Sequence, residues 1–372
     1  DLSILHGTLY LMKPVSPRGK RLTIDNFFRS LADDQAERSI CIILSGTGSD
    51  GTLGLKSIKG VGGMAMVQSA DSARYDGMPR SAINTGQADY ILPPQEMPKQ
   101  LMNFVKCAFV PGGLKMVPGL AQAKNDLDKI FLLLRRQTGH DFSQYKRKTI
   151  SRRIERRMAI NQIEEIGDYV RYLQQDSREL DSLFKELLIG VTSFFRDPEA
   201  FEAVQRKLFP QLFADRPPEV PLRIWVPGCS TGEEAYTLAI LLHEYANTLK
   251  EAPEVQIFGT DLDEEAIEKA RTGLFPDSIA ADISAERLKR FFEKEDSAYR
   301  VKSDIRESVV FAGQSLIKDP PFSRLDLISC RNVLIYLEPE LQQKVISLFH
   351  YALRPGGWLL LGNSETLGTF GD

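Results

Sequence analysis

Apolar positions in the first part of the chain form short runs separated by polar stretches. The runs occupy residues 39–44, 62–68 and 89–92. Between the first two, residues 52–62 carry apolar side chains at helical spacing. Strands that alternate with helical segments are typical of an α/β domain. We therefore predict a partial α/β domain over residues 1–106, followed by a linker over residues 107–123, where Pro and Gly are frequent.

The rest of the chain first loses this alternation and then regains it. Leu, Ile and Phe recur at helical spacing over residues 124–213, which predicts an all-helical domain. Buried strands are then predicted at residues 222–228, 255–262, 308–314, 325–331 and 356–363. They indicate a doubly wound parallel sheet in residues 214–372. The interval 273–307 exceeds a normal crossover and contains a possible strand, so we expect a small β subdomain inserted there.

The composition excludes several classes of protein. Hydrophobic residues make up 42% of the chain, charged residues 26%, and the net charge is −3. These values are ordinary for a globular protein and argue against one dedicated to nucleic acid. No apolar run approaches the roughly 20 residues of a membrane span, so no membrane insertion is expected. The four scattered cysteines predict reduced thiols in a cytoplasmic protein, and the four histidines lack metal-ligand spacing, so no metal site is expected.

A glycine turn after the strand at residues 222–228 marks the candidate site. Gly228 lets a ligand approach the backbone closely, and the next helix starts with Glu233 and Glu234. Two acids repel a pyrophosphate and attract a cationic sulfonium that carries an ammonium group, which favours a methyl donor over a dinucleotide. Asp261 ends the next strand, where an acid accepts hydrogen bonds from ribose hydroxyls. The alternative is that these acids only favour helix starts.

Five motifs follow one another from residue 192 onward. They are TSFFRD (Thr192–Asp197), GCSTGEEAY (Gly228–Tyr236), TDLD (Thr260–Asp263), DPPF (Asp319–Phe322) and CRNVLIYL (Cys330–Leu337). With LRPGG before the last strand, they resemble the class I methyltransferase fold and, more narrowly, the chemotaxis-receptor methyltransferase (CheR) family. The resemblance covers the chain from about residue 125 to its end. It implies methyl transfer from S-adenosylmethionine, with S-adenosylhomocysteine as product, to glutamate side chains on the cytoplasmic helices of chemoreceptors.

The resemblance also implies roles for single residues. Arg196 would steer the acceptor carboxylate and Tyr336 would lie beside the donor methyl; without the resemblance, they read as an exposed helix-start residue and a packing tyrosine. Cofactor contacts are implied for Thr192, Arg196, Gly228, Glu233, Glu234, Asp261, Ser315, Leu316, Arg331 and Asn332. A glutamate with a pKa of about 4.3 is anionic at neutral pH, so no strong base is needed. Gly190 and Ser315 stand where the family often has Asn, which predicts fewer side-chain contacts to the cofactor.

A basic stretch precedes these motifs. Its candidate docking residues are Lys146, Arg147, Arg152, Arg153, Arg156 and Arg157. Ile150, Ile154 and Met158 recur at helical spacing and give the same helix an apolar edge. A charge run is usually only a solvated face, and a nucleic-acid surface would carry interleaved aromatic residues, which this stretch lacks. The family resemblance points instead to acidic receptor helices as the partner.

Gly46, Gly48 and Gly51 satisfy the spacing GxGxxG directly after a strand, but Asp50 lies where a pyrophosphate would bind. The surrounding motifs GTGSDGTLGL, DGMPRSAI and IDNFFRSLA resemble the C-terminal half of the chemotaxis methylesterase (CheB) family. In that family Asp50 would be the acid of a Ser-His-Asp triad, and its partners would lie upstream of this sequence. The setting of His6 does not match. We expect Asp50 to act here only as a helix cap, and no esterase activity.

The leading hypothesis is therefore a fused methylesterase and methyltransferase, cut at its N-terminus, in which only the transferase is intact. A second hypothesis is a cofactor-sensing or receptor-binding module with little turnover. A third is a methyltransferase for another carboxylate or a small molecule. Calorimetry with S-adenosylhomocysteine and a methyl-transfer assay on a receptor fragment distinguish the first two: binding without transfer favours the second.

Overall fold

The structure, a computed structural model, describes residues 1–13, 22–109, 120–188, 190–214, 216–296 and 298–367. It divides into two compact units, and each is described by itself. The first unit comprises Asp1–Ser143, Arg147–Val191 and Pro276–Ala281. The second unit comprises Gln144–Lys146, Thr192–Phe275 and Asp282–Asp372.

The first unit contains the α/β region predicted at the start of the chain. Its three-stranded parallel sheet has the order β3 (Ile40–Ile43), β4 (Met64–Gln68) and β5 (Tyr90–Leu92). Helices α1 (Thr23–Gln35), α2 (Thr52–Gly60), α3 (Gly77–Asn84) and α4 (Met97–Phe109) accompany it, with short 3-10 turns η1 (Ala36–Arg38) and η2 (Ala70–Ser72). All residues of β4 are buried, as expected for the middle strand of a covered parallel sheet. The three predicted strands are confirmed.

A hairpin that the sequence pattern did not predict opens the unit. Strands β1 (Leu2–Leu5) and β2 (Thr8–Leu11) pair antiparallel, and Gly7 in the turn has φ +73°. Each strand is only four residues long, and β2 is fully exposed. Such a short strand with no buried face gives no alternating pattern, which is why it was missed.

The helical region also belongs to the first unit. It consists of α5 (Leu120–Thr138), α6 (Arg147–Ile160), α7 (Ile166–Gln175) and α8 (Ser177–Leu188). The apolar edge of α6 is buried as its spacing predicts, with Ile150, Ile154 and Met158 all below 4% exposed. Helix α4 continues to Phe109 and α5 begins at Leu120, so helices occupy both ends of the stretch expected as a linker. Pro and Gly are confined to its middle, which lies outside the described residues.

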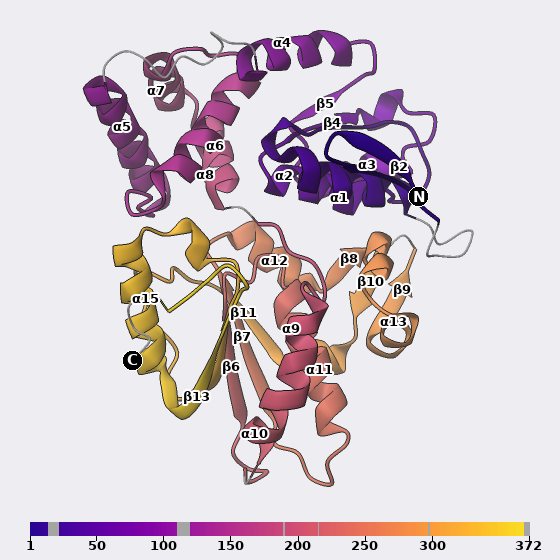
Figure 1. The fold of residues 1–372 in the computed structure, drawn as a ribbon, viewed down its shortest axis with the longest axis vertical. Helices are drawn as coiled ribbons and strands as arrows, with labels where there is room; N and C mark the ends of the chain where they lie inside the picture. Colours follow the sequence, from indigo (N-terminus) through magenta and orange to yellow (C-terminus); the bar gives the residue numbers. More distant parts are fainter. Residues whose placement is uncertain (14–21, 110–119, 189, 215, 297, 368–372) are drawn as a thin grey trace. The chain divides into compact units, whose positions relative to one another are not determined.

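The second unit contains a five-stranded parallel sheet. Its order is β11 (Val309–Gly313), β7 (Val255–Asp261), β6 (Leu222–Pro227), β12 (Leu325–Cys330) and β13 (Leu353–Leu361). All four pairings are parallel, which confirms the predicted doubly wound sheet. Figure 1 shows α11 (Glu233–Ala246) and α15 (Pro339–Ala352) on opposite faces of the sheet. The unit also contains α9 (Pro198–Ala203), the π-helical turn η3 (Val204–Leu208), α10 (Phe209–Phe213) and α12 (Glu264–Thr272).

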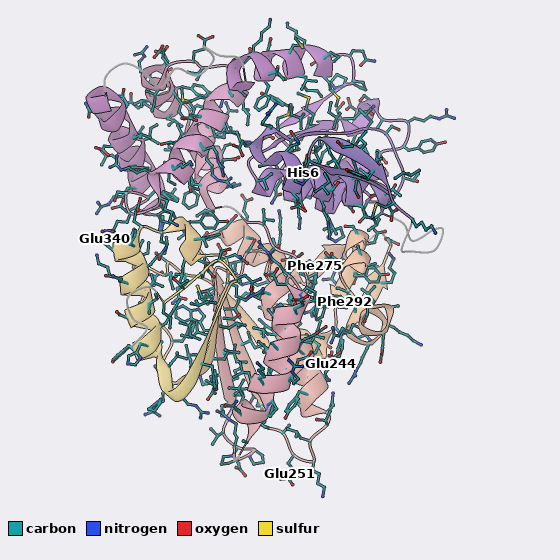
Figure 2. The ribbon with its side chains drawn as sticks, in the orientation of Figure 1. His6, Glu244, Glu251, Phe275, Phe292 and Glu340 are labelled. Atoms are coloured by element: carbon teal, nitrogen blue, oxygen red, sulfur yellow. The ribbon has the colours of Figure 1, made fainter. Side chains whose placement is uncertain are left out.

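The expected insertion lies between α12 and β11. Three short strands form a sheet in the order β8 (Leu274–Pro276), β10 (Ala298–Val301) and β9 (Phe292–Glu295). They are accompanied by α13 (Ala285–Phe291) and α14 (Ser303–Arg306), while the turn η4 (Asp277–Ala281) belongs to the first unit. Phe275 and Phe292, labelled in Figure 2, both make edge contacts with the ring of Phe194, at centroid distances of 4.8 and 5.5 Å. The predicted small β subdomain is confirmed.

None of the helices in the described ranges combines the length and the apolar character that crossing a bilayer requires.

Candidate active site

The turn that leaves β6 is built on two glycines with left-handed backbone. Gly228 has φ +69° and Gly232 has φ +92°. A Cβ on Gly228 would lie 2.5 Å from Cγ2 of Val333, and a Cβ on Gly232 would lie 2.9 Å from Cβ of Ala270. Only glycine can adopt these φ values and fit in the available space. Without side chains at these two positions, the backbone of the turn is accessible at the carboxyl end of the sheet.

Asp261 connects this turn to the end of β7. Its Oδ2 accepts the backbone N–H of Ser230 at 2.8 Å, and its Oδ1 accepts that of Asp263 at 2.9 Å. Burial raises the pKa of Asp261, and these amide hydrogen bonds oppose the rise. Each carboxylate oxygen offers a further lone pair, so the group retains acceptor capacity beyond the two amides. The structure therefore places Asp261 at the predicted strand end and adds a role in holding the turn.

Glu233 and Glu234 begin α11 but have different surroundings. Glu233 is 2% exposed, and its Oε2 accepts the hydroxyl of Thr231 at 2.6 Å. Glu234 Oε1 accepts the hydroxyl of Ser329 at 2.6 Å, and its Oε2 lies 3.3 Å from Nη1 of Arg331. Burial raises the pKa of Glu234, while the charges of Arg331 and Arg196 oppose the rise. Both acids favour the helix N-terminus, and Glu234 also belongs to a buried ion pair.

Arg331 is committed to protein groups. Its Nη2 donates to the carbonyl of Arg196 at 2.9 Å and to Oδ2 of Asp197 at 2.7 Å. Its guanidinium also lies 4.7 Å from the ring centroid of Phe201, and its side chain is 1% exposed. The resemblance implied a cofactor contact for Arg331, which stays a prediction; its Nε has no hydrogen-bond partner. The structure shows that Arg331 also joins the end of β12, the start of α11 and the segment of residues 192–197.

The segment of residues 192–197 is held in an unusual backbone conformation. Phe195 and Asp197 have φ +52° and +60°, a region that non-glycine residues rarely adopt. The backbone N–H of Phe195 donates to Oγ1 of Thr237 on α11 at 3.1 Å, and the buried Phe194 anchors the segment on the aromatic contacts described above. Thr192 and Arg196 are half-buried. The carbonyl of Arg196 accepts Nη2 of Arg331, and Nη1 of Arg331 lies 3.3 Å from Glu234 at the start of α11.

The end of β11 carries an unsatisfied hydroxyl. The backbone N–H of Gln314 donates to the carbonyl of Asp261 at 2.9 Å, which ties the two strand ends together. Ser315 is 7% exposed, and its N–H donates to Oδ2 of Asp319 at 2.7 Å, but its Oγ has no hydrogen-bond partner. Leu316 packs against the apolar cluster of β12 and α15. A buried hydroxyl without a partner costs free energy, so it marks a place where a ligand would satisfy it.

The loop after β12 depends on a residue whose role the sequence did not reveal. The carboxylate of Glu365 accepts four backbone N–H groups, from Asn332, Val333, Leu334 and Gly362, at 2.7–2.8 Å. Asn332 adopts φ +61°, and the clamp maintains this conformation. Glu365 follows the last strand in the stretch LRPGGWLLLGNSE, so its place in a motif was visible in the sequence. Its hydrogen-bond partners in the loop lie 31 to 33 residues earlier, and the sequence did not indicate them.

Tyr336 lies in the turn η5 (Leu334–Tyr336), which contacts Gln144–Lys146, a short segment of the same unit. Its carbonyl accepts the N–H of Lys146 at 2.8 Å, and Tyr145 forms an antiparallel bridge with Leu337. Burial raises the pKa of Tyr145, and the charge of Asp261 adds to the rise. The bridge with Leu337 therefore brings the backbone of Tyr145 to the loop that carries Tyr336. No local pattern in the sequence indicated this approach.

The residues of the basic helix do not share one face. Arg147 and Arg152 are exposed, while Arg153 and Arg156 are buried at 4% and 7%. Arg157 pairs with Glu179, and Lys146 is half-buried in the second unit. The prediction that Arg153 and Arg156 belong to an exposed basic surface is therefore wrong, because both are buried. Their partners lie far away in the sequence, which explains the error.

Asp50, the proposed remnant of a triad, caps a helix. Its carboxylate accepts the N–H groups of Ile24 and Asp25 at 3.1 and 2.9 Å, at the start of α1. The helix that it caps is therefore α1 and not α2, which follows it in the sequence. His6 lies in the turn between β1 and β2, where its backbone N–H donates to Asp34 (Figure 2).

Comparison with known families divides the chain into three matches. Residues 190–371 match the CheR methyltransferase, SAM binding domain. Residues 125–188 match the CheR methyltransferase, all-alpha domain, and residues 5–101 match the CheB methylesterase family.

Three relatives show how far the likeness extends. A 104.1 kDa protein of Rhodobacter capsulatus is 40% identical over 98% of this chain, which spans only 40% of that protein's length. The chemotaxis protein methyltransferase of Listeria monocytogenes is 32% identical over 65% of this chain and 92% of its own length. Chemotaxis protein methyltransferase 1 of Pseudomonas aeruginosa is 30% identical over 68% of this chain and 94% of its own.

Proposed function

The chain belongs to the CheR methyltransferase family, and from that premise we propose that it transfers a methyl group from S-adenosylmethionine to glutamate side chains of chemotaxis-type receptor proteins. The observation that carries the proposal is the carboxyl end of the five-stranded sheet. There, buried acids, a glycine turn and the unsatisfied hydroxyl of Ser315 come from three adjacent strands. This set suits a ligand that is both cationic and polar.

The residues present fit S-adenosylmethionine. Glu233 and the uncovered turn at Gly228 suit the cationic amino-acid end, and the free lone pairs of Asp261 suit ribose hydroxyls. Ser315 Oγ and the neighbouring Gln314 Oε1, both buried and without partners, suit the polar edge of a base. When bound, the cofactor supplies a methyl group on a positively charged sulfur.

The chain's own residues have three tasks in the reaction. They must bind the acceptor carboxylate, orient one of its oxygens and exclude water. Arg196, whose carbonyl accepts Nη2 of Arg331, is proposed to hold the acceptor carboxylate through charge-assisted hydrogen bonds. Tyr336, in the loop clamped by Glu365, is proposed to line the space beside it. Because a glutamate carboxylate is already anionic at neutral pH, no side chain has to remove a proton.

The proposal is tested in two steps on the whole chain. Isothermal calorimetry with S-adenosylhomocysteine should show one binding site, and incubation with radiolabelled cofactor and a chemoreceptor cytoplasmic fragment should give base-labile label on the receptor. Replacing the methylated glutamates of the fragment by alanine should abolish the label. Binding without transfer would contradict an enzyme acting on receptor glutamates and would favour a sensing module.

We also propose that the segment matching the methylesterase family does not hydrolyse methyl esters in this chain. Asp50, which the resemblance implies to be the acid of the triad, instead caps the start of α1 with its carboxylate. The proposal would be overturned by release of methanol from a methylated receptor fragment that this chain catalyses and that an Asp50→Asn variant does not.

A further inference from the structure

Two arginines of α6 are buried against the segment of residues 5–101, which matches the methylesterase family and is called here the esterase-like segment. Arg153 Nη2 donates to the carbonyl of Gly60 at 3.2 Å. Arg156 donates from Nη2 to the carbonyl of Gly63 at 2.8 Å and from Nε to the same carbonyl at 3.1 Å. Both belong to the first unit, as does the whole esterase-like segment. Two arginines of the basic helix are therefore hydrogen-bonded within this unit and are not available to a partner.

These arginines belong to a buried ion cluster of Lys59, Asp89, Arg153, Arg156 and Glu186. Lys59 Nζ lies 2.7 Å from Oδ1 of Asp89, and Arg156 Nη1 lies 2.7 Å from Oε2 of Glu186. Each of the five side chains is at most 10% exposed. Burial alone would raise the pKa of Glu186, but the charges of Lys59, Arg156 and Arg153 outweigh it and hold the pKa at about 2. The acids of the cluster therefore stay ionised at neutral pH.

An apolar contact surrounds the ion cluster. Met64 and Met66 of β4 pack in one buried group with Ala159 and Ile160 at the end of α6, and both methionines are fully buried. The hydroxyl of Tyr90 donates to the carbonyl of Ile160 at 2.8 Å. Fully buried apolar side chains together with satisfied buried charges are typical of a permanent interface.

We propose that the esterase-like segment is a fixed cover on one side of α6, and that it determines which basic residues of this helix are available to a receptor. Arg153 and Arg156 lie under the cover. Arg147, Lys148 and Arg152 are exposed, and Arg152 Nη1 lies 3.7 Å from Oε2 of Glu37 in the esterase-like segment. This inference rests on the proposed function for the identity of the partner, but the cover itself does not. It gives the esterase-like segment a role that requires no catalysis.

The cover stays in place during turnover because opening it is costly. Removing Asp89 from Lys59 and Arg156 leaves buried cations without their partner, which is strongly destabilising. A receptor with an acidic surface would have to replace Asp89 and the carbonyls of Gly60 and Gly63 at once. The exposed arginines make only exposed ion pairs, Arg147 with Asp128 at 3.8 Å and Arg152 with Glu37 at 3.7 Å, and such pairs cost little to replace.

Arginine labelling tests the cover on the whole chain. Phenylglyoxal modification followed by peptide mass spectrometry gives a rate for each arginine. We expect Arg147 and Arg152 to react at least about tenfold faster than Arg153 and Arg156, because the latter react only when the structure opens. Equal rates for Arg152 and Arg156 in the unmodified chain would overturn the proposal.

A charge-reversal variant tests which part of the chain provides the protection. Asp89→Lys places a cation beside Lys59 and Arg156, so Arg153 and Arg156 should approach the labelling rate of Arg152. Asp71→Lys makes the same charge change at an exposed position of the same segment and should leave the rates as they were. Continued protection of Arg153 and Arg156 in Asp89→Lys would overturn the proposal, since the helical bundle alone would then bury them.

A receptor fragment added before labelling tests the consequence for docking. It should slow the modification of Arg147 and Arg152 and leave the low rates of Arg153 and Arg156 unchanged. Protection of neither exposed arginine, with methyl transfer intact, would refute the role of the cover in docking. Absence of methyl transfer would instead refute the proposed function, and the labelling pattern of the free chain would still decide whether the cover exists.

Discussion

Two strand–turn–helix elements of this chain share one backbone feature and differ in chemistry. In the first unit β3 leads through a glycine turn to α2, and in the second unit β6 leads through a glycine turn to α11. The residue before each helix is a glycine in the left-handed region, Gly51 at φ +94° and Gly232 at φ +92°. A Cβ would meet a neighbour at 3.0 Å in the first case and 2.9 Å in the second.

The difference lies in what the acids near each turn do. Asp50, before α2, gives its carboxylate to the start of α1. Asp261, at the end of the strand next to β6, holds the second turn and retains acceptor capacity, and two glutamates begin α11. The comparison teaches that a glycine turn after a parallel strand specifies a shape. The ligand is specified by the charges placed around it.

The largest expected effect comes from removing the arginine that supports the acids of the second turn. Arg331→Gln should lower the free energy of unfolding by about 3–5 kcal/mol, because Glu234 is left buried without its partner. Urea denaturation measures the loss. Arg178→Gln, which removes an arginine that is 88% exposed and paired with Asp176, should cost less than about 1 kcal/mol. Similar losses in the two variants would contradict the structural role of Arg331.

Helix α1, which packs beside the first turn, carries a buried carboxyl that makes the stability of the chain depend on pH. Asp25 is 1% exposed; burial raises its pKa to about 7, and its Oδ2 has no partner. The folded chain therefore binds this proton more tightly than the unfolded chain, and stability falls as the pH rises from about 4 to about 7, by up to about 1.4 kcal/mol per unit. Asp25→Asn should remove this slope in urea unfolding measured at several pH values. The exposed Asp33→Asn on the same helix should keep it, and parallel profiles for the two variants would refute the assignment.

Matched glycine substitutions test the common shape directly. Gly51→Ala and Gly232→Ala each force a Cβ into the left-handed region against a close neighbour, so each should destabilise the chain by roughly 2 kcal/mol. Only Gly232→Ala should also weaken binding of S-adenosylhomocysteine in calorimetry. Equal weakening by Gly51→Ala would show that the two turns are not separate in function.

The smallest expected effects come from replacing the aspartate near each turn, Asp261 or Asp50, by asparagine. Asp261→Asn should weaken binding of S-adenosylhomocysteine by about tenfold, or about 1.4 kcal/mol, because one amide acceptor replaces a carboxylate. Asp50→Asn should lower stability by less than about 1 kcal/mol as a weakened cap and leave cofactor binding unchanged. An intact affinity in Asp261→Asn would remove this residue from the proposed cofactor site.

The sequence patterns predicted the elements with a continuous buried face. The five strands of the second unit and the three strands of β3 to β5 were predicted because apolar runs bounded by turn residues are typical of parallel sheets. The hairpin β1–β2 was missed because it buries almost nothing. The inserted subdomain was predicted from the length of the interval and from one possible strand within it.

The site was predicted less completely, and the errors have one physical cause. Gly228 follows β6, Asp261 ends β7 and Glu233 begins α11, so local motifs indicate where they lie. Tyr145 and Glu365 reach the site through contacts with residues distant in the sequence, and no periodicity reveals such contacts. The burial of Arg156 has the same origin, since its partners Asp89 and Glu186 lie 67 and 30 residues away.

The clamp made by Glu365 has a consequence for the order of events during synthesis. The backbone of Asn332 to Leu334 acquires its acceptor only after 31 to 33 further residues have been added. At a translation rate of 5–20 residues per second, this delay is roughly 2 to 7 seconds. Until then the nascent chain holds β6, β7 and their acids but lacks a fixed loop after β12. The ribosome thus delivers the cofactor-facing turn well before the loop that completes the pocket, so competence to bind should appear late and in a single step.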